Sequence, residues 1–224
     1  PVIVENLLEM IEKLTGQKRK SKILKTSKFR SAILSKKPIA YWPLDDLSVT
    51  ETMDLTENHT SKYQGSVALH LNGIKKNGLD DSNKCVYFAG GSFVSELKNP
   101  LEEFSISLFF WSANAPIPKG HEDTLVELIS NDISTKIILE PGNGLLSSLK
   151  VKSDRTSRSG IYKSSARNWH NLTIEYGGDH IRIYVNGELD IDSRLAKGSK
   201  PITHILFGAF DGKLDEIVVY PKSK

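Results

Sequence analysis

Hydrophobic and polar residues alternate over most of the chain after residue 38, in short segments separated by Gly, Asn, Asp and Pro. In FSISLFFWS (104–112), Phe104, Ile106, Leu108 and Phe110 would face one side of a strand and the serines the other. Strands are predicted near 39–44, 66–71, 84–88, 92–96, 104–112, 124–130, 135–140, 145–151, 169–176, 179–186, 202–208 and 213–220. Many short strands, close turns and almost no helix predict an all-β, antiparallel sandwich.

The first 37 residues follow a helical period instead. One apolar stripe predicts an amphipathic helix over about residues 3–15. A second short helix is predicted over Lys28–Ser35, with Ser27 as its N-cap. Pro38 ends this segment, because a proline disfavours helix in the residue before it. The residues of the second helix expected to face inward are Phe29, Ala32 and Ile33.

The formal net charge of +3 conceals an uneven distribution. Residues 1–38 hold ten Lys/Arg and three acids, a net charge of +7, whereas residues 39–224 hold twenty and twenty-four, a net charge of −4. The chain therefore divides into a basic helical arm (1–37) and a body (38–224). Such an arm is expected to dock on a partner or to oligomerise. Its predicted contact residues are Leu7, Leu8, Ile11, Leu14, Lys18, Arg19 and Lys20.

Composition excludes several classes of protein. The single cysteine, Cys85, rules out an intrachain disulfide and hence a disulfide-framed secreted module. No apolar run approaches the roughly 18 residues of a membrane span, and the N-terminus shows no signal-peptide pattern. The basic segment lacks aromatic interleaving and any motif for specific nucleic-acid binding. Neither a Walker A loop, nor GxGxxG, nor a histidine pair at metal spacing is present, so no enzyme is predicted.

Five segments, in order along the body, carry a resemblance to a known family. They are IAYWPLDD (39–46), VYFAGGSFV (86–94), FSISLFFWS (104–112), NWHNLTIEYGGDHIRIYVNGELD (168–190) and FGAFDGKLDEIVVYPKS (207–223). These segments resemble strands of laminin-G-like domains, which have the concanavalin A-like jelly-roll fold. The resemblance implies a jelly-roll sandwich over the whole body, preceded by the short α-helical arm. The resemblance indicates a fold and does not by itself indicate a function.

The resemblance also makes calcium a candidate ligand, because many domains of this fold bind Ca²⁺ through carboxylate, amide and backbone oxygens. The candidate ligands are Asp45, Asp46, Asp54 and Asn58. The loop MDLTENHT (53–60) departs from the family pattern, since Glu57 stands where the family has glycine. A hydrogen-bonded turn without metal is the alternative. No other cofactor is expected.

A glycan site needs exposed aromatic rings and polar side chains. The three tryptophans are expected to be buried or half-buried strand residues, which leaves tyrosines and a basic hairpin loop. The candidate ligand-binding residues are Tyr63, Arg155, Arg158 and Tyr162. The basic loop could meet an anionic glycan or a neighbouring subunit, or could simply be solvated.

ELDID (188–192) is the segment with a pattern used in catalysis. Some glycosidases of the jelly-roll fold use a Glu-x-Asp-x-Glu run, and Glu188, Asp190 and Asp192 would share one face of a strand. A retaining pair needs carboxyls about 5–5.5 Å apart. Asp192 stands where the pattern has Glu, and its shorter side chain argues against the pairing.

The segment FRSAILSKKPIAYWPLDD (29–46) resembles the lead-in of laminin-G-like proteins of tailed bacteriophages. The expected function is therefore that of a non-enzymatic virion structural protein (a decoration, tail or fibre-associated component) at the virion surface. Its arm would contact other virion proteins, and its sandwich would stabilise the particle or bind host-surface glycans. A free, extracellular carbohydrate-binding adhesin and a glycoside hydrolase are the alternatives. Deleting residues 1–37 is expected to leave a folded sandwich.

Overall fold

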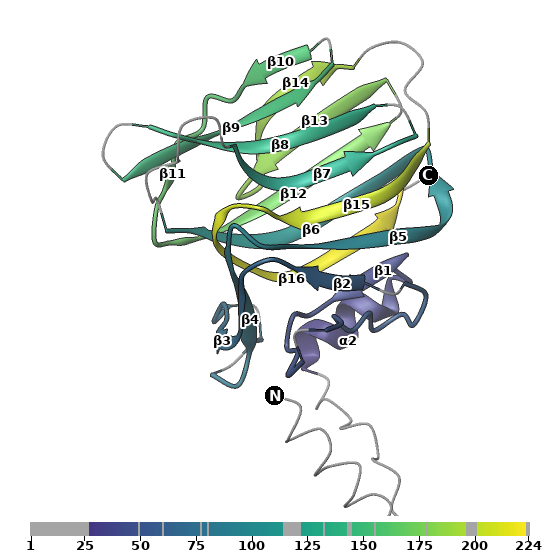
Figure 1. The fold of residues 1–224 in the computed structure, drawn as a ribbon, viewed down its shortest axis with the longest axis vertical. Helices are drawn as coiled ribbons and strands as arrows, with labels where there is room; N and C mark the ends of the chain where they lie inside the picture. Colours follow the sequence, from purple (N-terminus) through teal and green to yellow (C-terminus); the bar gives the residue numbers. More distant parts are fainter. Residues whose placement is uncertain are drawn as a thin grey trace, which may run out of the picture.

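The computed structural model describes residues 27–48, 50–59, 61–76, 78–79, 81–113, 122–131, 133–142, 145–154, 156–177, 179–195 and 201–222. Two antiparallel sheets lie face to face, with one short helix at one end of the molecule (Figure 1). The elements are α2 (Lys28–Ser35), β1 (Ala40–Trp42), β2 (Ser61–Gln64), β3 (Val67–Asn72), β4 (Lys84–Ala89), β5 (Ser92–Leu101), β6 (Glu103–Ser112), β7 (Asp123–Ile129), β8 (Ser134–Pro141), β9 (Leu146–Ser153), β10 (Thr156–Ser159), β11 (Ser164–Ser165), β12 (Trp169–Gly177), β13 (His180–Val185), β14 (Glu188–Arg194), β15 (Ile202–Gly208) and β16 (Asp211–Pro221).

The strand order identifies the two layers. Sheet A runs β14-β13-β12-β6-β16-β4-β3, with β1 paired to β16. Sheet B runs β10-β9-β8-β7-β15-β5-β2, with β11 paired to β9. Strands far apart in the chain are neighbours in both sheets, as in a jelly roll, and all pairs given are antiparallel. The predicted all-β antiparallel sandwich with a short preceding helix is confirmed.

The core lies between the sheets and follows the alternation in the sequence. In β6, Phe104, Ile106, Leu108 and Phe110 are at most 1% exposed, whereas the residues between them are half-buried. Apolar residues from both sheets form one continuous cluster. Burial of alternate residues on β6, β12 and β13 explains why the period-2 pattern predicted these strands. The short polar strands β2, β10 and β11 lack that pattern and were not predicted.

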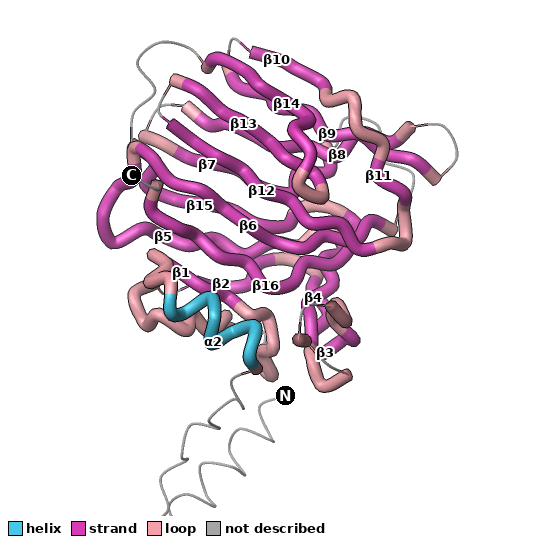
Figure 2. Tube along the Cα trace, turned by 180° about the vertical axis from the view of Figure 1, so that it is seen from behind, coloured by secondary structure: helices cyan, strands magenta, loops and turns pink. Residues whose placement is uncertain are grey.

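Helix α2 has the predicted bounds but not the predicted inward face. The side chain of Ser27 accepts a hydrogen bond from the backbone N–H of Arg30 at 3.2 Å, as an N-cap does. Ile33 and Phe29 pack toward the body, beside Tyr41 and Val218 of sheet A. Figure 2 shows α2 lying beside β1 and β16. The expectation that Ala32 faces inward is wrong, since this residue is exposed. Arg30 is buried instead, because its side chain reaches carboxylates beneath the helix.

Arg30 fixes α2 to the body. Only 5% of its surface is exposed. Its guanidinium donates to Glu216 Oε1 from Nε at 3.0 Å and from Nη2 at 2.7 Å, and from Nη1 to Asp45 Oδ2 at 2.5 Å. Asn83 Oδ1 accepts another hydrogen bond at 2.9 Å, and the hydroxyl of Tyr41 donates to Glu216. These five residues are called the Arg30 cluster below.

The charges in the Arg30 cluster stabilise one another. Burial by itself lowers the pKa of Arg30, but the hydrogen bond and charge of Asp45, with the charge of Glu216, hold that pKa above its ordinary value. Burial raises the pKa of Glu216, and the charge of Arg30 acts in the opposite direction. The helix is thus held by a buried ion pair with every guanidinium nitrogen hydrogen-bonded, and not by apolar packing alone.

A β-bulge in β16 supplies the carboxylates. The register between β16 and β6 shifts after Asp215, and Glu216 has a φ of 51°. An extra residue in one strand lets two successive side chains lie on the same side. Asp215 accepts hydrogen bonds from the backbone N–H of Ile74 at 2.8 Å and from Asn83 Nδ2 at 2.7 Å. Burial, and next the charge of Glu216, raises the pKa of Asp215 well above its ordinary value.

The described residues include only the second part of the predicted arm. Residues 1–26, including all the predicted docking contacts, lie outside the described residues. The second part, α2, packs against sheet A. Among the helical residues that the structure describes, no segment has the length and apolar character needed to cross a bilayer.

Candidate functional site

An aromatic row crosses four neighbouring strands of sheet A, near one end of β12 and β6. Trp169 of β12 lies in register with Trp111 of β6, and Trp111 with Lys213 of β16. Lys213 lies in register with Tyr87 of β4. Residues directly opposite each other on paired strands share a face of the sheet. The four residues Trp169, Trp111, Lys213 and Tyr87 are called the aromatic row below.

The aromatic row lies on the outer face of sheet A, the face turned away from sheet B. Each member has a buried neighbour next to it in the chain, and three of these neighbours belong to the core between the sheets: Phe110 before Trp111, Leu214 after Lys213 and Phe88 after Tyr87. His170, after Trp169, is also buried. Successive side chains of a strand point to opposite faces. All four members of the row are half-buried, so each presents part of its surface to solvent.

Lys213 contacts one of the rings in the row. Its Nζ atom lies 4.8 Å from the centroid of the Trp111 ring. A cation at this distance over an indole is attracted by the ring electrons. The ammonium and the two tryptophans therefore form one surface with both apolar and hydrogen-bonding character.

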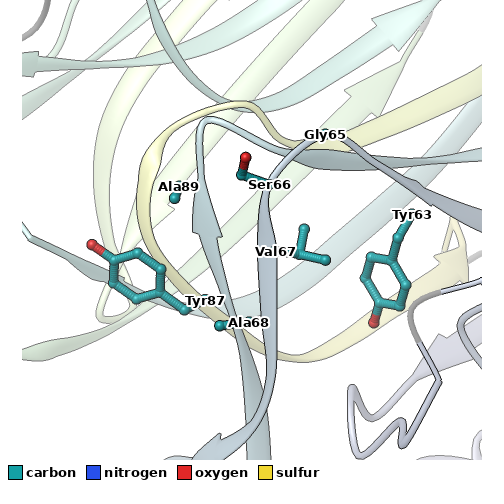
Figure 3. Close-up of a pocket in the computed structure, with 7 residues that line it drawn as sticks. All are labelled: Tyr63, Gly65, Ser66, Val67, Ala68, Tyr87 and Ala89. Carbon is teal, nitrogen blue, oxygen red and sulfur yellow. The ribbon is translucent and has the colours of Figure 1, made fainter. Parts of the chain in front are cut away.

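Two carboxylates and a hollow lie at the Tyr87 end. The hydroxyl of Tyr87 donates to Asp211 of β16. Burial, and next the charge of Asp211, raises the pKa of Asp123 to about 6. An open hollow of about 440 Å³ adjoins this end at the β2–β3 turn (Figure 3). Its lining residues are Tyr63, Gly65, Ser66, Val67, Ala68, Tyr87 and Ala89.

The structure scatters the predicted ligand-binding residues. Tyr63 lines the hollow, although its ring packs against Phe93 and its hydroxyl donates to Asp46 at 2.7 Å. Tyr162 packs against the core, and its hydroxyl accepts from Asn186 Nδ2 at 2.9 Å. Arg158 is exposed on β10. Arg155 lies outside the described residues.

The predicted calcium ligands have other partners. Asp45 pairs with Arg30, and Asp46 accepts from the backbone N–H of Met53 at 2.9 Å. The Asp54 carboxylate accepts from the backbone N–H groups of Tyr41 at 2.8 Å and Asn58 at 3.2 Å, so Asn58 contributes its backbone here. Within the described ranges, no three His, Cys, Asp or Glu side chains are placed to hold a metal ion. The alternative of a hydrogen-bonded turn accounts for the role of Asp54.

The expectation that the ELDID carboxylates share a face is wrong. The register between β13 and β14 shifts so that Leu189 pairs with Tyr184 and Ile191 with Ile183, which leaves Asp190 as a bulge. Asp190 accepts from the backbone N–H of Ile161 at 2.7 Å, in the loop before β11. Asp192 instead pairs with His180 and with Arg182. The bulge separates the carboxylates, and two of them have structural partners.

Cys85 and His170 belong to the interior. Cys85 is fully buried, and burial raises the pKa of its thiol to about 12, which leaves it protonated at neutral pH. The ring of His170 packs on Phe110 at a centroid distance of 5.4 Å, and its Nε2 lies 2.9 Å from the Ser165 carbonyl oxygen. Both residues have packing roles in the described structure.

Trp111 and Trp169 were not among the predicted ligand-binding residues. Both were expected to be buried or half-buried strand residues, and both are half-buried in the structure. The alternation of side chains between the two faces of a strand already indicates that these two rings face outward. Phe110 was predicted to face the core, so its neighbour Trp111 had to face outward, and the same parity applies to Trp169 beside His170.

No family model matches the chain, and no curated protein matches it. Solved structures do share its fold. One is the receptor-binding domain of botulinum neurotoxin mosaic serotype C/D, with 15% identity and a TM-score of 0.58 over 84% of this chain and 48% of that chain. Another is domain 4 of AbnA, a GH43 extracellular arabinanase from Geobacillus stearothermophilus, solved with arabinotriose; it has 15% identity and a TM-score of 0.57 over 83% of this chain and 92% of that one.

A third similar structure comes from botulinum neurotoxin type C, whose cell entry depends on interaction with two ganglioside molecules. It has 15% identity and a TM-score of 0.55 over 87% of this chain and 50% of that chain. The chain thus spans about half the length of the toxin domains it matches. At these identities the likeness shows the sandwich fold, and the laminin-G type remains a resemblance in sequence.

Proposed function

We propose that this protein is a non-enzymatic carbohydrate-binding module and that the aromatic row is its binding surface. The observation that carries the proposal is the register of Trp169, Trp111 and Tyr87 on one exposed sheet face. The fold supports it, since one similar structure holds arabinotriose and another belongs to a toxin that interacts with gangliosides.

The chemistry of the row suits sugars. Aromatic faces provide apolar contact area for the C–H face of a sugar ring, and hydroxyls need hydrogen-bonding partners around that contact. Lys213 supplies a donor beside Trp111, and Asp211 supplies an acceptor beside Tyr87. The row therefore offers both kinds of contact on one surface built on rigid strands.

Binding is a better proposal than hydrolysis. The bulge at Asp190 divides the run of carboxylates that suggested a glycosidase, and Asp192 pairs with His180 and Arg182. A retaining mechanism needs two carboxyls facing one substrate bond. The ELDID segment offers no such pair.

Substitution of Trp111 is expected to weaken glycan binding strongly. Trp111→Ala removes the central ring of the row, and binding should weaken by about 2 kcal/mol, or roughly 30-fold, as for a tryptophan at the centre of an interface. A glycan array on the intact chain, followed by calorimetric titration of the best glycan, measures the change. Tyr184→Ala is the matched control, because Tyr184 is a half-buried aromatic on the same sheet, paired with Leu189 outside the row.

Equal loss in Trp111→Ala and Tyr184→Ala would show that binding depends on the sheet in general. Unchanged binding in Trp111→Ala would place the glycan elsewhere on the sandwich. Both variants should first be checked for an unchanged melting temperature, since Trp111 also contacts Lys213.

The setting in which the module acts is a second proposal. We infer a virion surface, with residues 1–26 docking on other virion proteins; the support is the resemblance of 29–46 and the basic character of the arm. A chain lacking residues 1–26 keeps α2 and the aromatic row. It should bind glycans normally but be absent from purified particles, as measured by mass spectrometry. Normal incorporation of the shortened chain would contradict docking through residues 1–26, whereas absence of the intact chain from particles would favour the free adhesin.

A further inference from the structure

We propose that the aromatic row takes an uncharged oligosaccharide that crosses the strands of sheet A between Trp169 and the Tyr87 end. This inference rests on the proposed function and names the class of ligand. Three features of the described residues carry it: the length of the row, the wall on one side of it and the charges at its end.

The row is longer than a single sugar ring. It crosses β12, β6, β16 and β4 in register, and neighbouring strands lie about 4.8 Å apart, so it spans about 14 Å. Ala68 of β3 continues the register beyond Tyr87 and lines the hollow. A ligand that contacts both Trp169 and the hollow must therefore contain several linked sugars.

Helix α2 closes one side of the row. Phe109 lies two residues before Trp111, on the same outer face of β6. The ring of Phe29 from α2 packs on Phe109 with a centroid distance of 6.4 Å. A ligand that lies on Trp111 and extends along β6 toward Phe109 therefore meets α2. A ligand that extends across the strands follows the aromatic row instead.

The charges favour an uncharged sugar at the Tyr87 end. Asp211 accepts a hydrogen bond from the hydroxyl of Tyr87. Burial, and next the charge of Asp211, raises the pKa of Asp123. The carboxylate of an acidic sugar at the same place would be repelled by the charge of Asp211. Sugar hydroxyls instead donate hydrogen bonds to carboxylates, and hydrogen bonds to a charged acceptor are the stronger kind.

Lys213 is the residue that could reverse this preference. Its ammonium lies over Trp111, in the middle of the row, and an acidic sugar there would gain a charge partner. The experiment therefore has to separate the contribution of Lys213 from that of Asp211.

The test is titration of the intact chain with neutral and acidic probes. The neutral probes are arabino-, xylo-, cello- and malto-oligosaccharides of one to five units, and the acidic probes are oligogalacturonides and sialyllactose. We expect affinity for the best neutral series to rise at least tenfold between one unit and four, and every acidic probe to bind at least tenfold more weakly than the best neutral one. Asp211→Asn should reduce that discrimination several-fold, whereas the control Asp192→Asn, at the β14 edge, should leave it unchanged.

Two results would overturn the inference while leaving the proposed function intact. One is a monosaccharide that binds as tightly as its tetramer. The other is tighter binding of acidic probes that Lys213→Met abolishes, which would make Lys213 the residue that sets the ligand class. Absence of binding by every neutral and acidic probe would instead contradict the proposed function.

Discussion

Replacing Arg30 by Ala is expected to destabilise the protein by about 3–5 kcal/mol, the usual cost of removing one partner of a buried ion pair. Arg30 holds Glu216 and Asp45 in a site where its own surface is 5% exposed. Without the guanidinium, both carboxylates lose their hydrogen-bonded cation, and Glu216 stays buried next to Asp215. For a chain of this size the melting temperature should fall by about 10 °C.

Two variants make the measurement specific. Arg158→Ala removes an exposed arginine on β10 and should change the free energy of unfolding by less than about 0.5 kcal/mol. The double variant Arg30→Met with Glu216→Gln removes both charges and should recover part of the loss, because it leaves no unpaired carboxylate at Glu216. No recovery would mean that Arg30 acts through packing alone.

The same cluster predicts how the chain tolerates shortening. A chain that begins at residue 27 retains Ser27, α2 and Arg30, and should melt at the temperature of the intact chain. A chain that begins at residue 38 lacks Arg30 and should be destabilised as strongly as Arg30→Ala. Equal melting temperatures of the two shortened chains in thermal unfolding would support the sequence-based boundary at residue 37.

Asp54→Ala is expected to cost about 3 kcal/mol, because it leaves several backbone donors of the 54–59 loop and of β1 without a partner. The Asp54 carboxylate accepts from the backbone N–H groups of Tyr41, Thr56, Asn58 and His59. The peptide N–H of Tyr41 belongs to a fully buried residue, so leaving it without an acceptor is expected to be costly. Asp46→Ala, which removes one backbone acceptor and one tyrosine partner, is the milder comparison.

The pH dependence of stability checks the same role. Burial alone raises the pKa of Asp54, but hydrogen bonds from His59, Tyr41 and Thr56 more than offset it and hold the pKa below its ordinary value. A carboxyl with a depressed pKa in the folded state stabilises above its unfolded pKa of about 3.9 and loses that contribution as the pH falls further. The loss of stability below about pH 4 should therefore be smaller in Asp54→Asn than in the intact chain.

A calcium site is the alternative interpretation of the Asp54 loop, and calcium titration separates it from a hydrogen-bonded turn. If the loop is a hydrogen-bonded turn, millimolar calcium and EDTA should give the same melting temperature within about 1 °C. A calcium-dependent rise that Asp54→Asn removes would restore the sequence-based interpretation of this loop as a metal site, since a bound ion stabilises the folded state by mass action.

The sequence by itself determined the elements whose burial repeats regularly. Alternation marked β6, β12 and β13, because one face of each strand is buried in the core. Asn186 and Gly187, a pair typical of a tight hairpin turn, join β13 to β14 with φ values of 54° and 87° that few other residue pairs adopt readily. The Ser27 cap and the proline after α2 likewise placed a helix correctly, since both signals act within a few residues.

Only the tertiary structure decided where the chemistry lies. Each of the bulges at Glu216 and Asp190 shifts the alternation by one residue. The first places the carboxylates of Asp215 and Glu216 beneath α2, and the second separates the carboxylates of the ELDID segment, whose pattern had suggested catalysis. Trp169, Trp111 and Tyr87 are far apart in the chain and meet because β12, β6, β16 and β4 are neighbours in sheet A. Strand order and register are set by the packing of the whole core, and this is why the local pattern predicted the sandwich but not the surface that we propose binds glycans.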